Sequence, residues 1–353
     1  MHFSLPLVAA LTAVFALPAV PASADTLVAS WNVKHLGWNN DKDISSVASV
    51  ASAFDLIALQ EVMSTEGLAS LEQQLETITG EAWETMASDA IGRGSYREHY
   101  AFLWKSSEVS WIDGAVVYID DRDAFAREPF SMRFETADNY RFVLASAHLI
   151  YGDSVREREL EVHALDSYHA WLQESFAGTP IYIAGDFNLP PANDAWGAIG
   201  QDTAPLITEG ATTLSPVNGR FANLYDNIWA PAGIEIPVTA SGIFNFPAEL
   251  GITHEVARET VSDHAPVWML LDPGATPVVL RPHAAPHELS SASGANLFDE
   301  PRSAGDVRGN RNSMIYHMDG CPGFNRMVER NIVAFDTKVS AEAAGYRMAK
   351  NCS

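Results

Sequence analysis

The chain has few cysteines, an excess of negative over positive charge and, after its first 24 residues, no long hydrophobic run. Only two cysteines occur, both near the C-terminus, which excludes a disulfide-dense miniature fold and a multi-cysteine zinc scaffold. The 22 Lys and Arg residues against 45 Asp and Glu residues give a formal charge of −23. This charge excludes binding of nucleic acid through bulk positive charge. A polyanionic substrate would therefore need a local device such as a metal ion.

The N-terminus has the pattern of a targeting segment. Residues 4–20 form an uncharged apolar run, and Ala22-Ser23-Ala24 follows with the small-x-small pattern that a signal peptidase cleaves. We expect export with cleavage after Ala24, which predicts a secreted protein, extracellular or periplasmic. A membrane anchor is the alternative, but Pro6, Pro18 and the shortness of the run argue against it. Because no later stretch reaches about 18 apolar residues, we expect no stable membrane association.

The 353 residues, 47% of them apolar, are enough for one large domain and an appendage. Short runs rich in β-branched and aromatic residues alternate with helical periodicities, which predicts an α/β domain. Several runs are apolar at nearly every position, as in strands that are covered on both faces. The predicted strands are 27–31, 54–59, 100–104, 115–119, 142–147, 180–184 and 266–271, and the helical periodicities lie at 44–54, 68–78 and 160–172.

The composition also predicts boundaries: a main domain over 25–271, a linker over 272–308 rich in Pro, Ala, Ser and Gly, and a small module over 309–353. Residues 301–353 hold 8 Lys and Arg against 5 Asp and Glu, or +3, which leaves −26 for the rest. We interpret this small excess of positive charge in residues 301–353 as an ordinary solvated surface; a contact for a polyanion is the alternative. Near the end of the Pro-, Gly- and Thr-rich stretch 201–257, we interpret His254 and Glu255 as loop surface.

Polar side chains follow the predicted strands where those strands end. Taken alone, a strand-end carboxylate is usually a solvated cap, but here six polar positions or pairs recur at successive strand ends. Oxygen ligands of this kind hold Mg²⁺, which neutralises a phosphate, and a His–Asp pair supplies a base that works near neutral pH. The pattern therefore predicts phosphodiester hydrolysis. The positions are Asn32, Glu61, His148, Asp186 with Asn188, Asp226, and Asp263 with His264.

These motifs resemble the endonuclease/exonuclease/phosphatase superfamily, and within it the secreted deoxyribonuclease I-like nucleases. The resemblance spans residues 27–271 and implies a four-layer α/β sandwich, in which two mostly antiparallel sheets face each other with helices outside. It rests on Ser30-Trp31-Asn32-Val33, Leu59-Gln60-Glu61-Val62, Ser146-Ala147-His148-Leu149, Gly185-Asp186-Phe187-Asn188, Tyr225-Asp226 and Ser262-Asp263-His264-Ala265-Pro266.

The resemblance implies a metal site. Glu61 would be the principal Mg²⁺ ligand, and Asn32 and Asp263 would lie close to the metal or its waters. Mn²⁺ or Ca²⁺ would substitute or assist. A structural Ca²⁺ is a further expectation, for which the sequence marks no site.

The same resemblance implies the catalytic groups. Asp186 and Asn188 would position the scissile phosphate and the attacking water, while His264, oriented by Asp226, would serve as general base. His148 would bind the phosphate and stabilise charge or protonate the leaving oxygen. The sequence leaves open whether Asp186 or His264 takes the proton of the water. The implied reaction is in-line hydrolysis that leaves a 5′-phosphate and a 3′-hydroxyl.

The segment from Gly92 to Tyr100 looks like the deoxyribonuclease stretch that contacts the minor groove of DNA. It implies Arg93 and Tyr96 as substrate contacts and Glu98 as the partner of His148. An ordinary hairpin with solvated charges is the alternative. We predict an endonuclease with little sequence specificity that acts on DNA, with RNA left open, and no protein partner.

Two alternatives to a nuclease predict different sequence features. A sphingomyelinase-like or other phosphodiesterase or phosphatase of the same fold would show exposed aromatic loops for membrane contact, and the sequence marks no clear one. A binding protein without catalysis would have lost Glu61, His148 or His264, and all three are present.

The C-terminal module is similar to the small zinc module of the Ada DNA-repair protein, which uses four cysteines. The matching positions hold His317, Cys321, Ala349 and Cys352, so one ligand is missing and a closed tetrahedral zinc site is disfavoured. In an exported protein we predict instead a disulfide between Cys321 and Cys352. A weak DNA anchor and a stabilising cap both remain open as its function.

Overall fold

The structure, a computed structural model, describes residues 25–38, 41–217 and 219–283 of the main domain. In the C-terminal module it describes 307–310, 314–318, 321, 324, 332–335, 338–343, 346–350 and 352. The predicted signal peptide and residues 284–306 of the predicted linker lie outside the described residues. Within the described part of the chain, no helix is long and apolar enough to cross a membrane.

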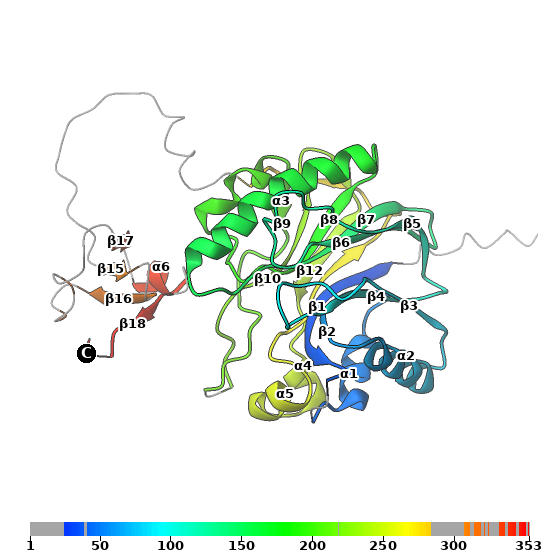
Figure 1. The fold of residues 1–353 in the computed structure, drawn as a ribbon, viewed down its shortest axis with the longest axis horizontal. Helices are drawn as coiled ribbons and strands as arrows, with labels where there is room; N and C mark the ends of the chain where they lie inside the picture. The colour runs from blue at the N-terminus through cyan, green and yellow to red at the C-terminus, as the bar shows by residue number, and fades with distance from the viewer. Residues whose placement is uncertain are drawn as a thin grey trace, which may run out of the picture.

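Two six-stranded sheets form the centre of the main domain (Figure 1). The first contains β1 (Thr26–Leu36), β2 (Leu56–Val62), β3 (Trp83–Ala87), β4 (His99–Lys105), β12 (Val238–Ile243) and β13 (Val267–Leu271). The second contains β5 (Val109–Val117), β6 (Phe130–Thr136), β7 (Arg141–His148), β8 (Ile181–Asp186), β9 (Thr203–Pro205) and β10 (Asp226–Pro231). Their strand orders are β12-β13-β1-β2-β4-β3 and β5-β6-β7-β8-β10-β9. Within these two sheets β1–β2 and β7–β8 pair in parallel, and the other neighbours pair antiparallel.

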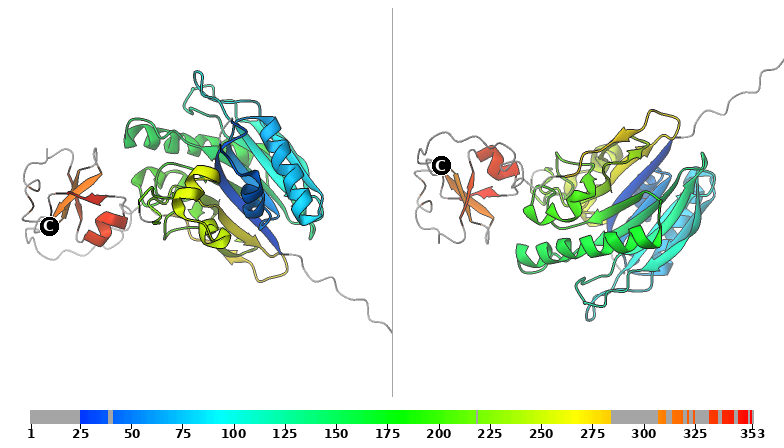
Figure 2. Two further views of the ribbon diagram at one scale, coloured as in Figure 1. Left: turned by 90° about the horizontal axis from the view of Figure 1, so that it is seen from below. Right: turned by 90° about the horizontal axis from the view of Figure 1, so that it is seen from above.

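Helices cover the outer face of each sheet (Figure 2). On the first sheet these are α1 (Ile44–Ala51), α2 (Thr65–Thr79), α4 (Phe246–Leu250) and α5 (His254–Thr260), and on the second α3 (Val155–Ser175) with the 3₁₀ turns η1 (Asp194–Gly197) and η2 (Ile199–Gln201). The main helix starts follow from capping side chains, since Asp43, Ser64 and Ser154 each accept hydrogen bonds from backbone N–H groups of the first turn. The predicted four-layer α/β sandwich is confirmed.

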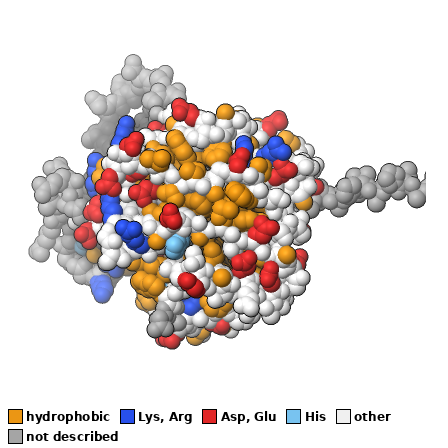
Figure 3. Space-filling view, turned by 45° about the vertical axis from the view of Figure 1, so that its right-hand side comes forward, with side chains coloured by type: hydrophobic (Ala, Val, Ile, Leu, Met, Phe, Trp, Pro, Cys, Tyr) orange, Lys and Arg blue, Asp and Glu red, His pale blue; other side chains and the backbone are white. Residues whose placement is uncertain are grey.

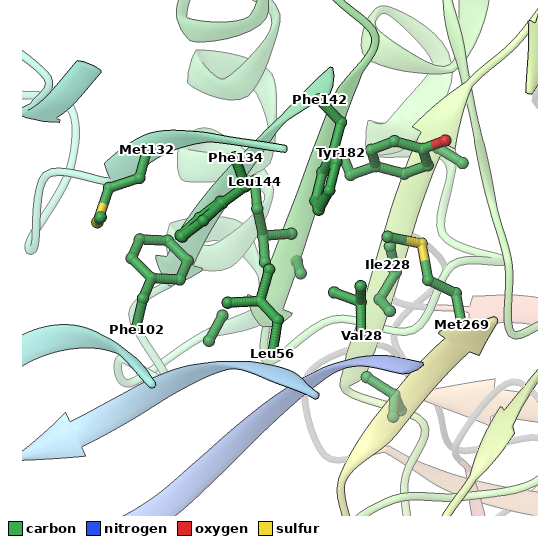
Figure 4. Close-up of a cluster of buried hydrophobic side chains, with 14 of the residues drawn as sticks. Val28, Leu56, Phe102, Met132, Phe134, Phe142, Leu144, Tyr182, Ile228 and Met269 are labelled. Atoms are coloured by element: carbon green, nitrogen blue, oxygen red, sulfur yellow. The ribbon is translucent and has the colours of Figure 1, made fainter. Parts of the chain in front are cut away.

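The space between the sheets is filled by large apolar side chains from both (Figure 4). The opposite face of the first sheet packs Trp31, Ile57 and Leu59 against the helices. Both faces of the central strands are therefore buried, which explains runs that are apolar at every position. The labelled side chains of the intersheet core are Val28, Leu56, Phe102, Met132, Phe134, Phe142, Leu144, Tyr182, Ile228 and Met269.

The topology brings the strand-end residues to one edge of the sandwich. The parallel pairs end together, so His148 lies opposite Asp186, and Asp186 in turn lies opposite Asp226 at the start of β10. Beneath this edge the buried Gln60 side chain donates to Ser146 Oγ at 2.9 Å and to Ser30 Oγ at 3.2 Å. This amide ties the two sheets together just below the place where their polar ends meet.

The interpretation of His254 and Glu255 as loop residues was wrong, because both lie in the first turn of α5. The stretch 201–257 holds β9, β10, β12, α4, the start of α5 and the short strand β11 (Glu235–Ile236). His254 begins α5, and its ring lies 4.9 Å from that of Phe221 between centroids. The start of the predicted linker also differs, because β14 (Val278–Val279) pairs with β11 and the main domain continues to residue 283.

The C-terminal module contains a four-stranded sheet in the order β17-β15-β16-β18. Its elements are β15 (Val307–Asn310), β16 (Ile315–Met318), β17 (Ile332–Phe335), α6 (Lys338–Ala343) and β18 (Arg347–Met348). The predicted disulfide between Cys321 and Cys352 is confirmed. His317 Nδ1 lies 3.8 Å from Cys352 Sγ.

Candidate active site

Two histidine–carboxylate pairs face the same aspartate. His148 Nδ1 lies 2.7 Å from Glu98 Oε1, and His264 Nδ1 lies 2.8 Å from Asp226 Oδ2. The Nε2 atoms of the two rings then point to Asp186 Oδ2, at 3.7 Å from His148 and 3.6 Å from His264. A carboxylate behind each ring sets its orientation and favours a proton on Nδ1 or on both nitrogens. Both imidazoles therefore present Nε2 to one point.

Glu61 and Asn32 lie beside this group. Asn32 Nδ2 donates to Glu61 Oε1 at 3.0 Å and to Asp186 Oδ2 at 3.1 Å. Two carboxylates thus share one amide group, with Asp186 buried and Glu61 only slightly exposed. Closely spaced, desolvated carboxylates favour a cation between them. This set of hard oxygen donors fits a divalent ion such as Mg²⁺.

The backbone at the site adopts conformations that most residues avoid. Glu61 and Asn188 have φ angles of 59° and 51°, in the left-handed region. Asn188 is held there, because its N–H donates to Asp186 Oδ1 at 3.0 Å and its side chain to the Leu149 carbonyl at 2.8 Å. Strained positions of this kind cluster at functional sites.

Burial and charge act in opposite directions on the two histidines. Burial alone would lower the pKa of His264, but Asp226 and Asp186 outweigh it and raise that pKa to about 10. The pKa of His148 is also raised, because Glu98 and Asp186 outweigh burial and the repulsion from Arg127. The raised pKa of His264 favours its imidazolium form, with a proton on the Nε2 atom that faces Asp186, and the neighbouring carboxylates shift the pKa of His148 in the same direction.

Asp263 faces two cations. Its Oδ2 lies 3.4 Å from Lys34 Nζ and 3.4 Å from Arg258 Nη2. Burial would raise the pKa of Asp263, but His264, Lys34 and Arg258 outweigh it and lower that pKa. Asp263 is therefore a charged carboxylate next to the site, and it already forms ion pairs with Lys34 and Arg258.

Of the predicted site residues just before β4, Glu98 and Tyr96 lie at the site and Arg93 lies outside it. Glu98 is fully buried against His148, as the resemblance implied. Tyr96 is close enough to Glu61 and Glu98 for burial and both charges to raise its pKa. Arg93, in contrast, is half exposed and pairs with Asp123 at 2.9 Å, so the structure does not bring it to the catalytic group.

The sequence interpretation missed several residues that hold this site. Arg127 Nε donates to the His148 carbonyl at 2.9 Å and lies 3.8 Å from Glu98 Oε2, while Tyr100 Oη accepts from the backbone N–H of His148 at 2.8 Å. His35 Nε2 lies 3.2 Å from Glu61 Oε2. Arg127 lies in a loop with no periodicity, and only the nearness of His35 to Asn32 in sequence could have marked it.

Residues 29–264 match the Endonuclease/Exonuclease/phosphatase family, and this range includes every member of the group just described. The chain belongs to this family. Among endonuclease/exonuclease/phosphatase proteins, a deoxyribonuclease of Thioalkalivibrio sp. (strain K90mix) is 48% identical over 261 residues, which cover 71% of this chain and 72% of that protein. Human deoxyribonuclease-1 is 29% identical over 286 residues, which cover 74% of this chain and 98% of the human protein.

Solved structures of endonuclease/exonuclease/phosphatase proteins share the fold. One from Bacteroides vulgatus has a TM-score of 0.53 at 16% identity, covering 70% of this chain and 99% of its own. The mannosyl-6-phosphatase Bt3783 of Bacteroides thetaiotaomicron has a TM-score of 0.51 at 15% identity, with the same coverage. Deoxyribonuclease I-like members of the family typically depend on a divalent metal, and this chain gathers the ligand types Asp186, Asp226 and His264 within 4.8 Å.

Proposed function

We propose that this chain is an exported, divalent-metal-dependent endonuclease that hydrolyses DNA phosphodiester bonds with little sequence specificity. The convergence of His148 and His264 on Asp186, beside Glu61 and Asn32, carries the proposal. The 48% identity to a deoxyribonuclease supports DNA as the substrate class. Export rests on the N-terminal sequence pattern, with cleavage near Ala24.

Glu61 and Asp186 would hold Mg²⁺, with Asn32 orienting both carboxylates beside it, and Mn²⁺ or Ca²⁺ would substitute or assist. When bound, the ion supplies neutralisation of the phosphate and activation of a water. The shared amide of Asn32 holds the two carboxylates in place before that, at 3.0 and 3.1 Å. Preorganised ligands of this kind avoid reorganisation at the moment of reaction.

The protein groups divide the work of proton transfer. Because His264 favours the imidazolium form, the proton of the attacking water would go to the Asp186 carboxylate, whose Oδ2 lies 3.6 Å from His264 Nε2. Asp226 holds His264 from behind and stabilises its positive charge. His148, held by Glu98, donates to the phosphate or to the leaving 3′-oxygen. Asn188 and Asp186 position the phosphate, and the product carries a 5′-phosphate.

The substrate class is tested with three compounds at equal concentration and with Mg²⁺. They are a duplex DNA fragment, sphingomyelin vesicles and a simple phosphate monoester. We expect only the DNA to be hydrolysed, and its ends to be joined again by a DNA ligase, which requires 5′-phosphates. Hydrolysis of the lipid or the monoester without cleavage of DNA would overturn the proposal.

A further inference from the structure

Three aromatic rings lie together beside the candidate metal ligand Glu61; we term His35, Trp38 and Tyr96 the ring cluster. The centroids of His35 and Trp38 are 4.3 Å apart, and Tyr96 lies 5.9 Å from Trp38 in an edge-to-face arrangement and 6.2 Å from His35. His35 joins the cluster to the site, because its Nε2 lies 3.2 Å from Glu61 Oε2. The rings therefore border the place where the scissile phosphate would bind.

The backbone projects this cluster from the sheet. The pairing of β1 with β2 shifts register between Asn32 and Leu36, and Lys34 and His35 have φ angles of 48° and 55°. Gly37, with a φ of 87°, then packs against the first turn of α2, where a Cβ atom would lie 2.4 Å from Ser64 Oγ. The segment before Trp38 is thus held by close packing against α2.

Trp38 is 48% exposed, although its neighbours His35 and Tyr96 are largely covered. A single exposed tryptophan needs no explanation on its own. This one packs at a 37° tilt against the His35 ring at the rim of a catalytic group, and about half of its surface is exposed. Flat aromatic surfaces beside phosphate sites bind unstacked nucleobases, because every base has a π-face.

The charge of the protein makes such a contact useful. The chain is strongly acidic, and on the face shown in Figure 3 Asp and Glu side chains are scattered around a central group of hydrophobic side chains. Long-range electrostatic attraction of DNA is therefore weak or opposed. Affinity from base stacking needs no net positive charge on the protein.

We propose that the ring cluster, with Trp38 as its exposed member, stacks on an unpaired nucleobase next to the scissile phosphate. Single-stranded or locally unpaired DNA is then a substrate class that this site favours, because bases within an intact duplex have their faces covered. This inference rests on the proposed nuclease function and adds His35 and Trp38 as residues that determine substrate preference.

The test compares Trp38→Ala and Trp38→Phe with the wild-type protein on single-stranded and duplex oligonucleotides of the same sequence. We expect Trp38→Ala to raise KM for the single strand about tenfold, with little change in kcat and less than about twofold change for the duplex. Trp38→Phe should recover most of the loss. Trp111→Ala, which removes a tryptophan of similar exposure on β5, is the matched control and should behave as wild type.

A second measurement does not depend on cleavage. A single strand that carries 2-aminopurine is titrated with protein in EDTA at about 0.15 M salt, which screens the repulsion between the acidic protein and DNA, and stacking on Trp38 should quench its fluorescence in the wild type but not in Trp38→Ala. Equal quenching in both proteins, or equal KM changes on both substrates, would overturn the inference. Binding of sphingomyelin vesicles that depends on Trp38, without an effect on DNA, would also overturn it. Quenching that depends on Trp38 without DNA cleavage by the wild type would overturn only the proposed function.

Discussion

Replacing His264 with alanine is expected to lower kcat for DNA cleavage by about 10²–10⁴-fold, and His148→Ala should do the same. The reason is that each ring presents Nε2 to Asp186 Oδ2 and is held by its own carboxylate, Asp226 or Glu98. KM should change much less than kcat, because the lost proton transfers belong to the transition state. Steady-state kinetics on duplex DNA with Mg²⁺ measures both constants.

Because the two histidines would act on one phosphate, the losses of activity caused by His148→Ala and His264→Ala should not add. The variant without both rings is expected to lose little more activity than the worse single variant. His163→Ala, which changes an exposed histidine on α3, is the control and should retain wild-type kcat. A loss below tenfold for either active-site variant would remove that histidine from the chemistry.

Gly185→Ala is expected to destabilise the main domain by about 4 kcal/mol, a loss at the upper end of single substitutions. Gly185 lies between Ala147 and Asn227 in the second sheet with a φ of 153°, and a Cβ atom would lie 1.8 Å from the Ala147 carbonyl oxygen. Relief of that contact must separate β7 from β8 where they deliver His148 and Asp186. Urea denaturation followed by circular dichroism measures the loss.

Gly178→Ala separates steric collision from backbone strain. Gly178 has a φ of 77°, but a Cβ atom there would meet nothing within 4 Å. Its substitution should therefore cost only about 1 kcal/mol, the effect of the left-handed backbone alone. Equal stability of the two variants would show that β7 and β8 can separate without cost, which would contradict a rigid edge beneath the site.

The short motifs and the family resemblance that they carry predicted the two-sheet sandwich and most of the polar residues that the structure brings together at its edge. Strands that are covered on both faces are largely apolar, and His148 is the polar residue that ends β7. Asn32, in contrast, lies within β1, which continues to Leu36 past the point where its pairing with β2 shifts register. β3 and β6 were missed, since both carry charged residues within the strand and neither is a continuous apolar run. No element was predicted within 201–257, because its strands and helices are short and interrupted by Pro and Gly.

Contacts between distant segments could not be predicted from composition or spacing. Arg127 supports His148 and Glu98 from a loop, and nothing in its own neighbourhood distinguishes it from a solvated arginine. Arg93 shows the converse, because a local motif suggested a substrate contact and the structure pairs the side chain with Asp123, 30 residues away in sequence. His35 was passed over since its partner Glu61 lies on a different strand.

The central claim is that Glu61 and its neighbours form a divalent-metal site that cleaves DNA. The most direct test is conversion of supercoiled plasmid to nicked and linear forms by the protein with Mg²⁺, beside EDTA and the variants Glu61→Ala and Glu84→Ala. Glu84, an exposed glutamate on β3, is the matched control. We predict nicking by the wild type and Glu84→Ala, and none in EDTA or with Glu61→Ala. Intact plasmid at high protein concentration with Mg²⁺, Mn²⁺ and Ca²⁺ each supplied, or nicking that persists in EDTA, would contradict the account.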